Sequence, residues 1–329
     1  MNTKRWLALV AAIVLLFVSI GFRFTMSIAS GLFDTIAEFD EHYYEEEILE
    51  DGDWDERIAV LDLEGIIQDI DLSVFLTEGY HHEQFLGMIE QAGEDSSIAA
   101  IILKINSPGG AVGETAQIHR KLVELQETYD KPIYVSMGAT AASGGYYVAA
   151  PADKIFAEPA TITGSIGVIM ESINYSELAE NYGVHFNTIK SGKHKDIMSP
   201  NREMTSEERD ILQSMIDEMY DDFVQVIVDG RQMDEEEVRK IGDGRVYTGR
   251  QAQEVGLVDE VGNFEDALLA MQEDFHLQDA QVVQYEIGTN FLSSLGMNLK
   301  GLFKRTPTEL DQVMSLLRES DKPRAMYIY

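Results

Sequence analysis

Residues 138–147 read Gly-Ala-Thr-Ala-Ala-Ser-Gly-Gly-Tyr-Tyr and set one serine, Ser143, among residues too small to cover it. The preceding residues 133–137 are typical of a buried strand, and residues 146–150 have helical character. A serine at such a strand-to-helix turn exposes its hydroxyl. Its backbone N–H lies at the positive end of the helix, where a developing oxyanion is stabilised. The stretch therefore predicts Ser143 as the nucleophile of an acyl-transfer site.

A second turn, Ser107-Pro108-Gly109-Gly110, follows the continuous apolar run of residues 97–105, which is the pattern of a buried parallel strand. Because Gly109 and Gly110 have no Cβ, their N–H groups can come close to a substrate carbonyl. Strands and helices alternate along this part of the chain and predict an α/β fold built from crossover units. Ligands collect at the carboxyl ends of the strands in such sheets, so we expect both turns at one site.

Other elements are predicted around this centre. Residues 66–70 are expected to form a strand that partners residues 57–63. The second half of the chain is more helical, with helices predicted at 172–182 and 205–228 and a strand at 184–189. No internal repeat is visible.

Composition excludes several classes of protein. The chain has 329 residues, 45% of them hydrophobic, which is enough for a large core. Its formal charge of −33 and pI of about 4.4 would repel phosphate backbones, so we expect no nucleic-acid binding. There is no cysteine, which excludes a thiolate nucleophile, a disulfide and a cysteine metal site.

The N-terminus predicts export. Lys4 and Arg5 precede a largely apolar run at 6–22, which residues 24–33 can lengthen into a bilayer-spanning helix. The flanking positive charge places the N-terminus in the cytoplasm and the catalytic domain outside, as in a single-pass protein of the cell membrane. The alternative is a cleaved signal peptide, with Ser27-Ile28-Ala29 as its cleavage site.

The charge pattern and these segments predict the organisation of the chain. Residues 34–56 contain twelve acidic residues and no Lys or Arg, which favours a solvated tether. We expect a transmembrane segment at 1–33, the acidic tether at 34–56, the catalytic domain at 57–290, and a C-terminal helical extension and tail at 291–329.

The base that would activate Ser143 is less obvious. Of the seven histidines, only His185 and His194 are candidates. A lysine is the alternative, but it must be neutral, and moving its pKa from about 10.4 to near 7 costs about 4–5 kcal/mol. Residues 189–198 offer three lysines after a predicted strand, and in an extended run Lys193 and Lys195 would share one face. A lysine base in so acidic a protein predicts an alkaline activity optimum.

Four motifs carry a family resemblance: Ser107-Pro108-Gly109-Gly110 and residues 141–147, 163–167 and 191–195. Together they closely resemble the signal peptide peptidase A family, in its short, single-repeat, membrane-anchored bacterial form. The resemblance covers about residues 58–268. It implies a Clp protease/crotonase-like fold of repeated β-β-α units.

The resemblance also implies roles for individual residues. Ser143 would be the nucleophile and Lys195 the general base, with Lys193 as its rival. Gly109 or Gly110, together with Gly144, would donate backbone N–H groups to the oxyanion. Ser165 would orient the lysine, although a serine in such a turn can also simply stabilise its own backbone. By the same resemblance, the protein would cleave leftover signal peptides at the membrane, form homo-oligomers and need no metal or other cofactor.

Other mechanisms and functions have to be compared with a Ser143/Lys195 peptidase. The Clp protease subunit has a histidine base a couple of dozen residues after its serine, but no histidine lies between Ser143 and His185, so that triad is excluded. A related membrane-associated Ser-Lys protease that acts on membrane proteins is one alternative, and a catalytically silent oligomeric scaffold is another. The apolar tail 323–329 is expected either to add as a strand along a substrate groove, in its own or a neighbouring subunit, or to pack as an ordinary edge strand.

Overall fold

The computed structural model describes residues 44–69, 80–287 and 325–329. Residues 46–286 and 325–329 belong to one compact unit. The predicted membrane segment at 1–33, part of the acidic tether and most of the C-terminal extension lie outside the described residues. Within the described part of the chain, no helix combines the length and the apolar character needed to cross a membrane.

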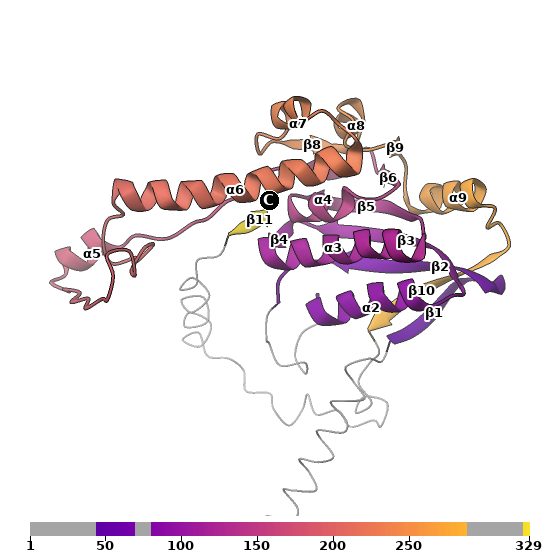
Figure 1. Cartoon of the computed structure of the whole chain (residues 1–329), viewed down its shortest axis with the longest axis horizontal. Coiled ribbons are helices and arrows are strands. Elements are labelled where there is room, and N and C mark those ends of the chain that lie inside the picture. The colour runs from indigo at the N-terminus through magenta and orange to yellow at the C-terminus, as the bar shows by residue number, and fades with distance from the viewer. Residues whose placement is uncertain (1–43, 70–79, 288–324) are drawn as a thin grey trace, which may run out of the picture. The chain divides into compact units, whose positions relative to one another are not determined.

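A large, mostly parallel β-sheet organises this unit (Figure 1). Its strands follow the spatial order β1 (Tyr44–Glu50), β10 (Ala280–Ile287), β2 (Asp53–Glu64), β3 (Ile98–Ser107), β5 (Ile133–Ala142), β6 (Lys154–Ala157) and β9 (Glu260–Val261). From β10 to β9, each strand is parallel to its neighbour. The predicted α/β class with a parallel sheet is thereby confirmed.

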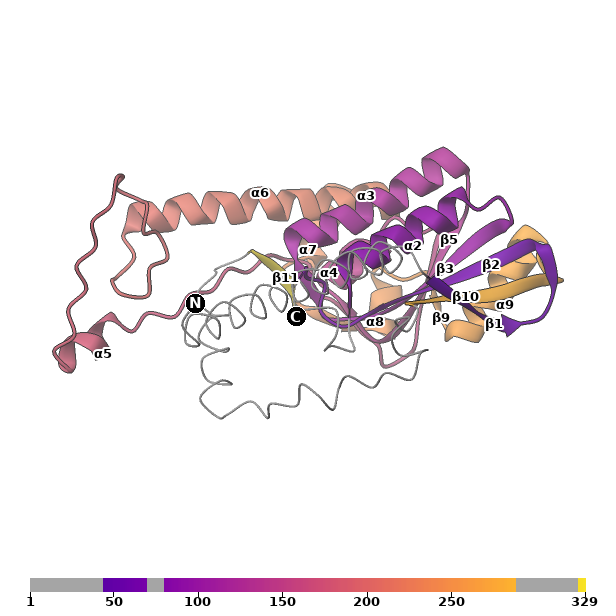
Figure 2. The same cartoon turned by 90° about the horizontal axis from the view of Figure 1, so that it is seen from below.

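The sheet is covered on both faces, as its apolar strands require. Ile101, Ile102 and Leu103 in the middle of β3 are all fully buried. Helices α2 (His82–Glu94) and α3 (Val112–Tyr129) lie on one side of the sheet and α9 (Phe264–Phe275) on the other (Figure 2). This packing fixes the carboxyl ends of β3 and β5, where both predicted turns lie.

Short elements complete this end of the sheet. Strand β4 (Gly109–Ala111) follows β3, and helix α4 (Gly144–Ala149) follows β5. Strand β7 (Ile162–Gly164) pairs in parallel with the end of β5 and antiparallel with β8 (Val246–Thr248). Helices α7 (Glu235–Ile241) and α8 (Gly249–Glu254) flank β8 in the sequence.

Residues 170–215 form an arm that contains α5 (Ser176–Asn181) and the first part of α6 (Ser206–Arg231) (Figures 1 and 2). Helix α6 begins with a capping box, in which the Thr205 hydroxyl accepts from the Glu208 N–H and the Glu208 carboxylate accepts from the Thr205 N–H. Its later residues Phe223, Val224 and Ile227 are buried. The arm is therefore fixed to the sheet unit through the second half of α6.

Three predicted elements differ from the structure. The strand expected at 184–189 is irregular, because Val184, Phe186 and Ile189 are exposed and meet no neighbouring strand in the described chain. The helix expected at 172–182 is limited to α5. The strand expected at 66–70 is wrong for its described part: Ile67 makes an isolated bridge to Gly110 instead of partnering residues 57–63.

Candidate active site

Ser143 lies at the junction between β5 and α4 in an uncommon backbone conformation. Its φ is 52° and its ψ is −115°, a region that costs a non-glycine residue about 1–3 kcal/mol. Its N–H donates to the carbonyl of Gly164 at 2.7 Å, so the end of β7 holds the turn in place. The side chain is 1% exposed and its Oγ has no hydrogen-bond partner among the described residues. The exposed hydroxyl that the sequence predicts is therefore buried in the structure, although it is free of hydrogen bonds within the described residues.

Three glycines pack against one another beside Ser143. A Cβ on Gly109, whose φ is +101°, would lie 2.6 Å from the Gly144 nitrogen, and one on Gly144 would lie 3.1 Å from the Gly110 nitrogen. The Gly109 N–H donates to the buried Ser107 hydroxyl at 3.1 Å. The two glycine turns of the sequence thus meet at one place. Because the Gly109 N–H is bound to Ser107, Gly110 and Gly144 are left as the candidate N–H donors to an oxyanion.

Ser165 is placed next to this centre. It directly follows Gly164, and its own φ is 50°. Its N–H donates to the carbonyl of Arg245 at 2.8 Å, and its side chain is 9% exposed. Ser165 therefore lies close to the backbone of Ser143, where a side chain that orients a base would have to be.

The C-terminal tail forms a strand beside the glycine turn. Strand β11 (Met326–Ile328) pairs antiparallel with β4, with Tyr327 opposite Gly110. On its other side, Met326 exchanges two backbone hydrogen bonds with Ile169, at 2.9 and 3.0 Å. The tail is thus held between two segments of the protein, as an added β-strand is.

The side chain of Tyr327 fills an aromatic cluster. It is 1% exposed, its ring stacks on Tyr147 with centroids 5.1 Å apart, and Phe223 lies 4.8 Å away. Its hydroxyl donates to the carbonyl of Met219 at 2.9 Å, and burial raises its pKa. This cluster is not predicted from the sequence: Tyr147 belongs to the serine motif, but nothing in the sequence marks Phe223.

His119 packs on the outer side of the same cluster. Its ring makes an edge contact with Tyr147, with centroids 5.2 Å apart. Burial lowers the pKa of His119 to about 4, so the ring is neutral near pH 7.

The structure does not bring Lys195 to Ser143 within one chain. Residues 189–198, which we call the lysine loop, lie at the start of α6, where Lys193 and His194 contact Glu207. Tyr147, four residues after Ser143, instead packs on Phe223 with ring centroids 5.0 Å apart. At 1.5 Å per residue, Glu207 and Phe223 are about 24 Å apart along the helix. Ser143 therefore lies near the second half of α6, and the loop that carries Lys195 lies at its first turn.

The lysine loop is folded into turns, so the expected extended run is wrong. Lys190 pairs with Asp196 at 2.5 Å, and Lys193 pairs with Glu207. Lys195 is exposed and its amine has no ion pair or hydrogen bond within the described residues. Lys190 and Lys193 thus form ion pairs, whereas the Lys195 amine forms none in the described part of the chain.

The fold and the site place a buried serine hydroxyl without a hydrogen-bond partner at the carboxyl edge of a parallel sheet, near a β-strand formed by the tail, which is an arrangement suited to a serine hydrolase. Comparison with known proteins identifies the class more closely. The family model for peptidase family S49 matches residues 126–278. A protein from Enterococcus faecium that carries the name signal peptide peptidase SppA is 38% identical over 346 residues, covering 100% of this chain and 99% of its own length.

Two further relatives agree. A protein from Methanocaldococcus jannaschii named as a protease is 40% identical over 222 residues, which is 68% of each chain. Protease 4 of Haemophilus influenzae is 30% identical over 314 residues, covering 89% of this chain and 50% of its own length. The chain belongs to peptidase family S49 and is a serine peptidase.

Proposed function

We propose that this protein is a membrane-anchored endopeptidase that degrades remnant signal peptides with a Ser143/Lys195 dyad. It would be anchored by residues 1–33, with the N-terminus in the cytoplasm and the catalytic domain outside the membrane. Its sheet would be that of the Clp protease/crotonase-like fold. The name of the Enterococcus faecium relative supports the substrate class.

One observation carries the proposal: the tail is bound as a β-strand between β4 and Ile169, a position we call the groove, near a serine hydroxyl that has no hydrogen-bond partner in the described chain. The backbone of Tyr327 is paired with that of Gly110. Hydrogen bonds from Val112 to Ala325 and from Tyr329 to Pro108 flank this pair, at 3.4 and 2.9 Å. We infer that a substrate pairs in the same register, with its side chain in the aromatic cluster and its carbonyl towards the glycines.

The chemistry follows from that placement. The Ser143 Oγ attacks the carbonyl carbon, and its proton passes to a neutral Lys195 amine. The Gly110 and Gly144 N–H groups stabilise the oxyanion of the tetrahedral intermediate. The protonated lysine then gives its proton to the leaving amine, and water hydrolyses the acyl-enzyme with the lysine again as base. Ser165 would orient the amine.

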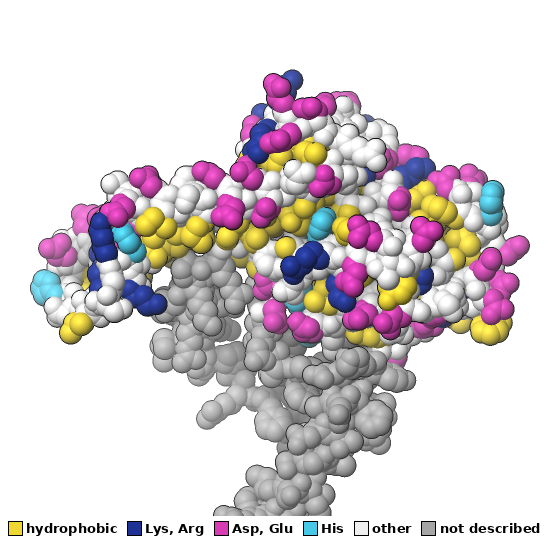
Figure 3. Space-filling model, viewed as in Figure 1, with side chains coloured by type: hydrophobic (Ala, Val, Ile, Leu, Met, Phe, Trp, Pro, Cys, Tyr) yellow, Lys and Arg dark blue, Asp and Glu magenta, His cyan; other side chains and the backbone are white. Residues whose placement is uncertain are grey.

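Because of the separation of about 24 Å along α6, we propose that Lys195 comes from a second copy of the chain. Exposed apolar residues on the arm support this arrangement (Figure 3), among them Ile173, Leu178, Tyr182 and Ile189, which are 60–101% exposed. In a head-to-tail homo-oligomer, each arm would cover its neighbour and deliver its lysine.

Mixing two inactive variants tests the proposal. The full-length protein should cleave an apolar signal-like peptide, and S143A and K195A should each be inactive while remaining folded. When the two variants assemble together at equal amounts, about one quarter of the sites combine an intact serine with an intact lysine, so about that fraction of activity should return. No recovery in confirmed mixed assemblies would refute the shared site, and an active K195A variant would refute the dyad.

If the wild-type assembly does not cleave the peptide but does cleave membrane proteins, the alternative substrate class holds. A wild-type protein that cleaves neither, even without its tail, would be a scaffold.

A further inference from the structure

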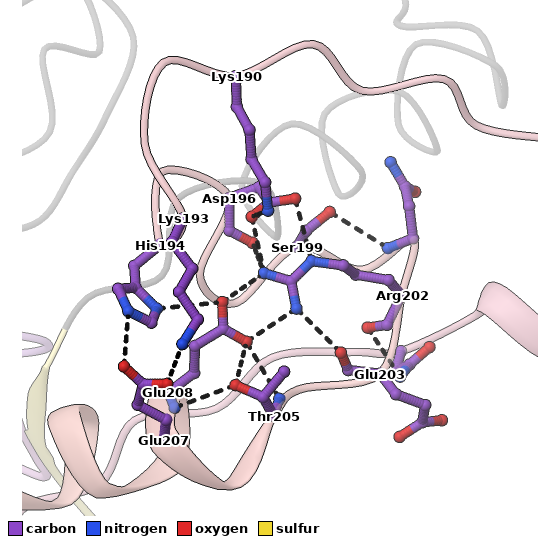
Figure 4. Close-up of polar contacts among 12 residues, drawn as sticks. Lys190, Lys193, His194, Asp196, Ser199, Arg202, Glu203, Thr205, Glu207 and Glu208 are labelled. Atoms are coloured by element: carbon purple, nitrogen blue, oxygen red, sulfur yellow. Dashed lines mark hydrogen bonds and ion pairs between the residues drawn. The ribbon is translucent and has the colours of Figure 1, made fainter.

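The loop that carries Lys195 is organised around a single arginine (Figure 4). Arg202 donates to both oxygens of Asp196, at 2.7 and 3.0 Å, and to both oxygens of Glu208, at 2.5 and 2.8 Å. It also donates to the backbone carbonyl of Asp196 at 3.0 Å. A planar guanidinium suits such paired contacts, which fix direction as well as distance. Arg202 thus connects the residue after Lys195 to the first turn of α6.

These contacts are more sheltered than the rest of the arm. The side chain of Glu208 is 2% exposed and that of Asp196 is 14% exposed. Hydrogen bonds from Arg202 lower the pKa of both carboxyl groups, that of Glu208 to about 2. Both carboxylates therefore stay ionised and bound to Arg202 throughout the neutral and alkaline range.

The three carboxylates that form ion pairs around the loop, those of Asp196, Glu207 and Glu208, all pair with side chains other than Lys195, and the Glu203 carboxylate forms no ion pair in the described part of the chain. The charged and titratable groups here are Lys190, Lys193, His194, Asp196, Arg202, Glu203, Glu207 and Glu208. Asp196 pairs with Arg202 and Lys190, and Glu207 with Lys193 and His194. A carboxylate close to a lysine favours its charged form, which cannot act as a base. The adjacent Asp196 would be such a group if it were released.

We propose that Arg202 is a positioning residue for Lys195. By holding Asp196 on Glu208, it fixes the backbone of the loop and keeps the Asp196 carboxylate away from the lysine amine. The inference rests on the proposed role of Lys195 as the base. Arg202 itself touches neither the substrate nor Ser143.

The test replaces Arg202 in the full-length protein. R202M should lower kcat by about 10- to 100-fold, as expected for a misplaced catalytic group, with little change in KM. The acidic limb of its kcat profile should also move to higher pH, because Asp196 is then no longer held on Glu208 and keeps only Lys190 as a partner. Adding D196N should return the limb to its wild-type position while kcat stays low.

Arg239 provides a matched control. It also pairs with two carboxylates, Asp221 and Glu235, but lies away from the lysine loop. R239M should leave both kcat and the pH profile unchanged. Thermal unfolding and size-exclusion chromatography check that each variant folds and assembles. Should R202M fail to fold, R202K keeps the charge without the paired geometry and should show the same changes at smaller size.

Two results would overturn the inference while leaving the dyad intact. One is full activity of R202M alongside an inactive K195A. The other is an equal loss of kcat at every pH, which would mean that Arg202 only stabilises the arm. An active K195A would instead show that the proposed dyad itself is wrong.

Discussion

The tail should act as a competitive inhibitor held in place chiefly by Tyr327. Its side chain is 1% exposed, packs on Tyr147 and Phe223, and donates a hydrogen bond to Met219. Truncating a buried aromatic side chain to alanine costs about 3–5 kcal/mol. Since each 1.4 kcal/mol is a factor of ten, Y327A should weaken tail docking by about 100- to 1,000-fold or more.

The kinetic consequence follows from competition. A docked tail reduces the fraction of sites that can accept a peptide, and the apparent KM rises by the inverse of that fraction. Y327A and deletion of residues 325–329 should therefore both lower KM, by at least about tenfold if the tail is docked for more than nine-tenths of the time, with kcat unchanged.

The assay is initial-rate cleavage of a fluorogenic apolar peptide by the full-length variants. Tyr329 offers a control, because its side chain is 56% exposed, so Y329A should behave as the wild type. A synthetic peptide with the sequence of residues 325–329 should restore inhibition of the deletion variant. An unchanged KM together with a lower Tm would refute the reasoning, and the tail would then be an ordinary edge strand.

Three further outcomes are expected. G109A should lose at least about 100-fold in activity, because a Cβ there would lie 2.6 Å from the Gly144 nitrogen, in a backbone conformation that side chains rarely adopt; peptide cleavage and circular dichroism check this. K131M should lower the free energy of unfolding by about 2–3 kcal/mol in urea titrations, because the buried ammonium donates to three carbonyls at the end of α2. The lysine loop should loosen on acidification. Arg202 lowers the pKa of Asp196 and Glu208, so their contribution is present above about pH 4, the unfolded value, and is lost as the pH falls through the folded values; hydrogen exchange of the arm between pH 5 and 2 measures it.

The serine turn could be predicted because its requirements are local. Only small residues allow α4 to approach the end of β3 so closely: a Cβ on Gly145 would lie 2.8 Å from the Ser107 carbonyl oxygen. The first half of the strand before it, residues 133–137 of β5, is mostly apolar because it is buried in the sheet. Such features leave a signature in the sequence itself.

The arm could not be predicted in the same way. A strand was expected at 184–189 because apolar, β-prone residues are normally buried in the same chain. Val184 and Ile189 are instead 49% and 101% exposed. The turns of the lysine loop depend on pairs such as Arg202 with Glu208, and spacing in the sequence does not reveal which charges meet. The separation of Ser143 from Lys195 depends on how α6 packs, which no local pattern encodes.

Activity at the proposed site depends on two conditions in addition to the Ser143 turn. The strained Ser143 turn is built into the sheet, so it persists in a single chain. The lysine must come from another copy, and the groove must be free of Tyr327. A single chain that meets a folded protein would then have a nucleophile without a base, and a groove already filled. Activity would require assembly and a peptide that displaces the tail, and both conditions favour free, extended peptides over folded proteins as substrates.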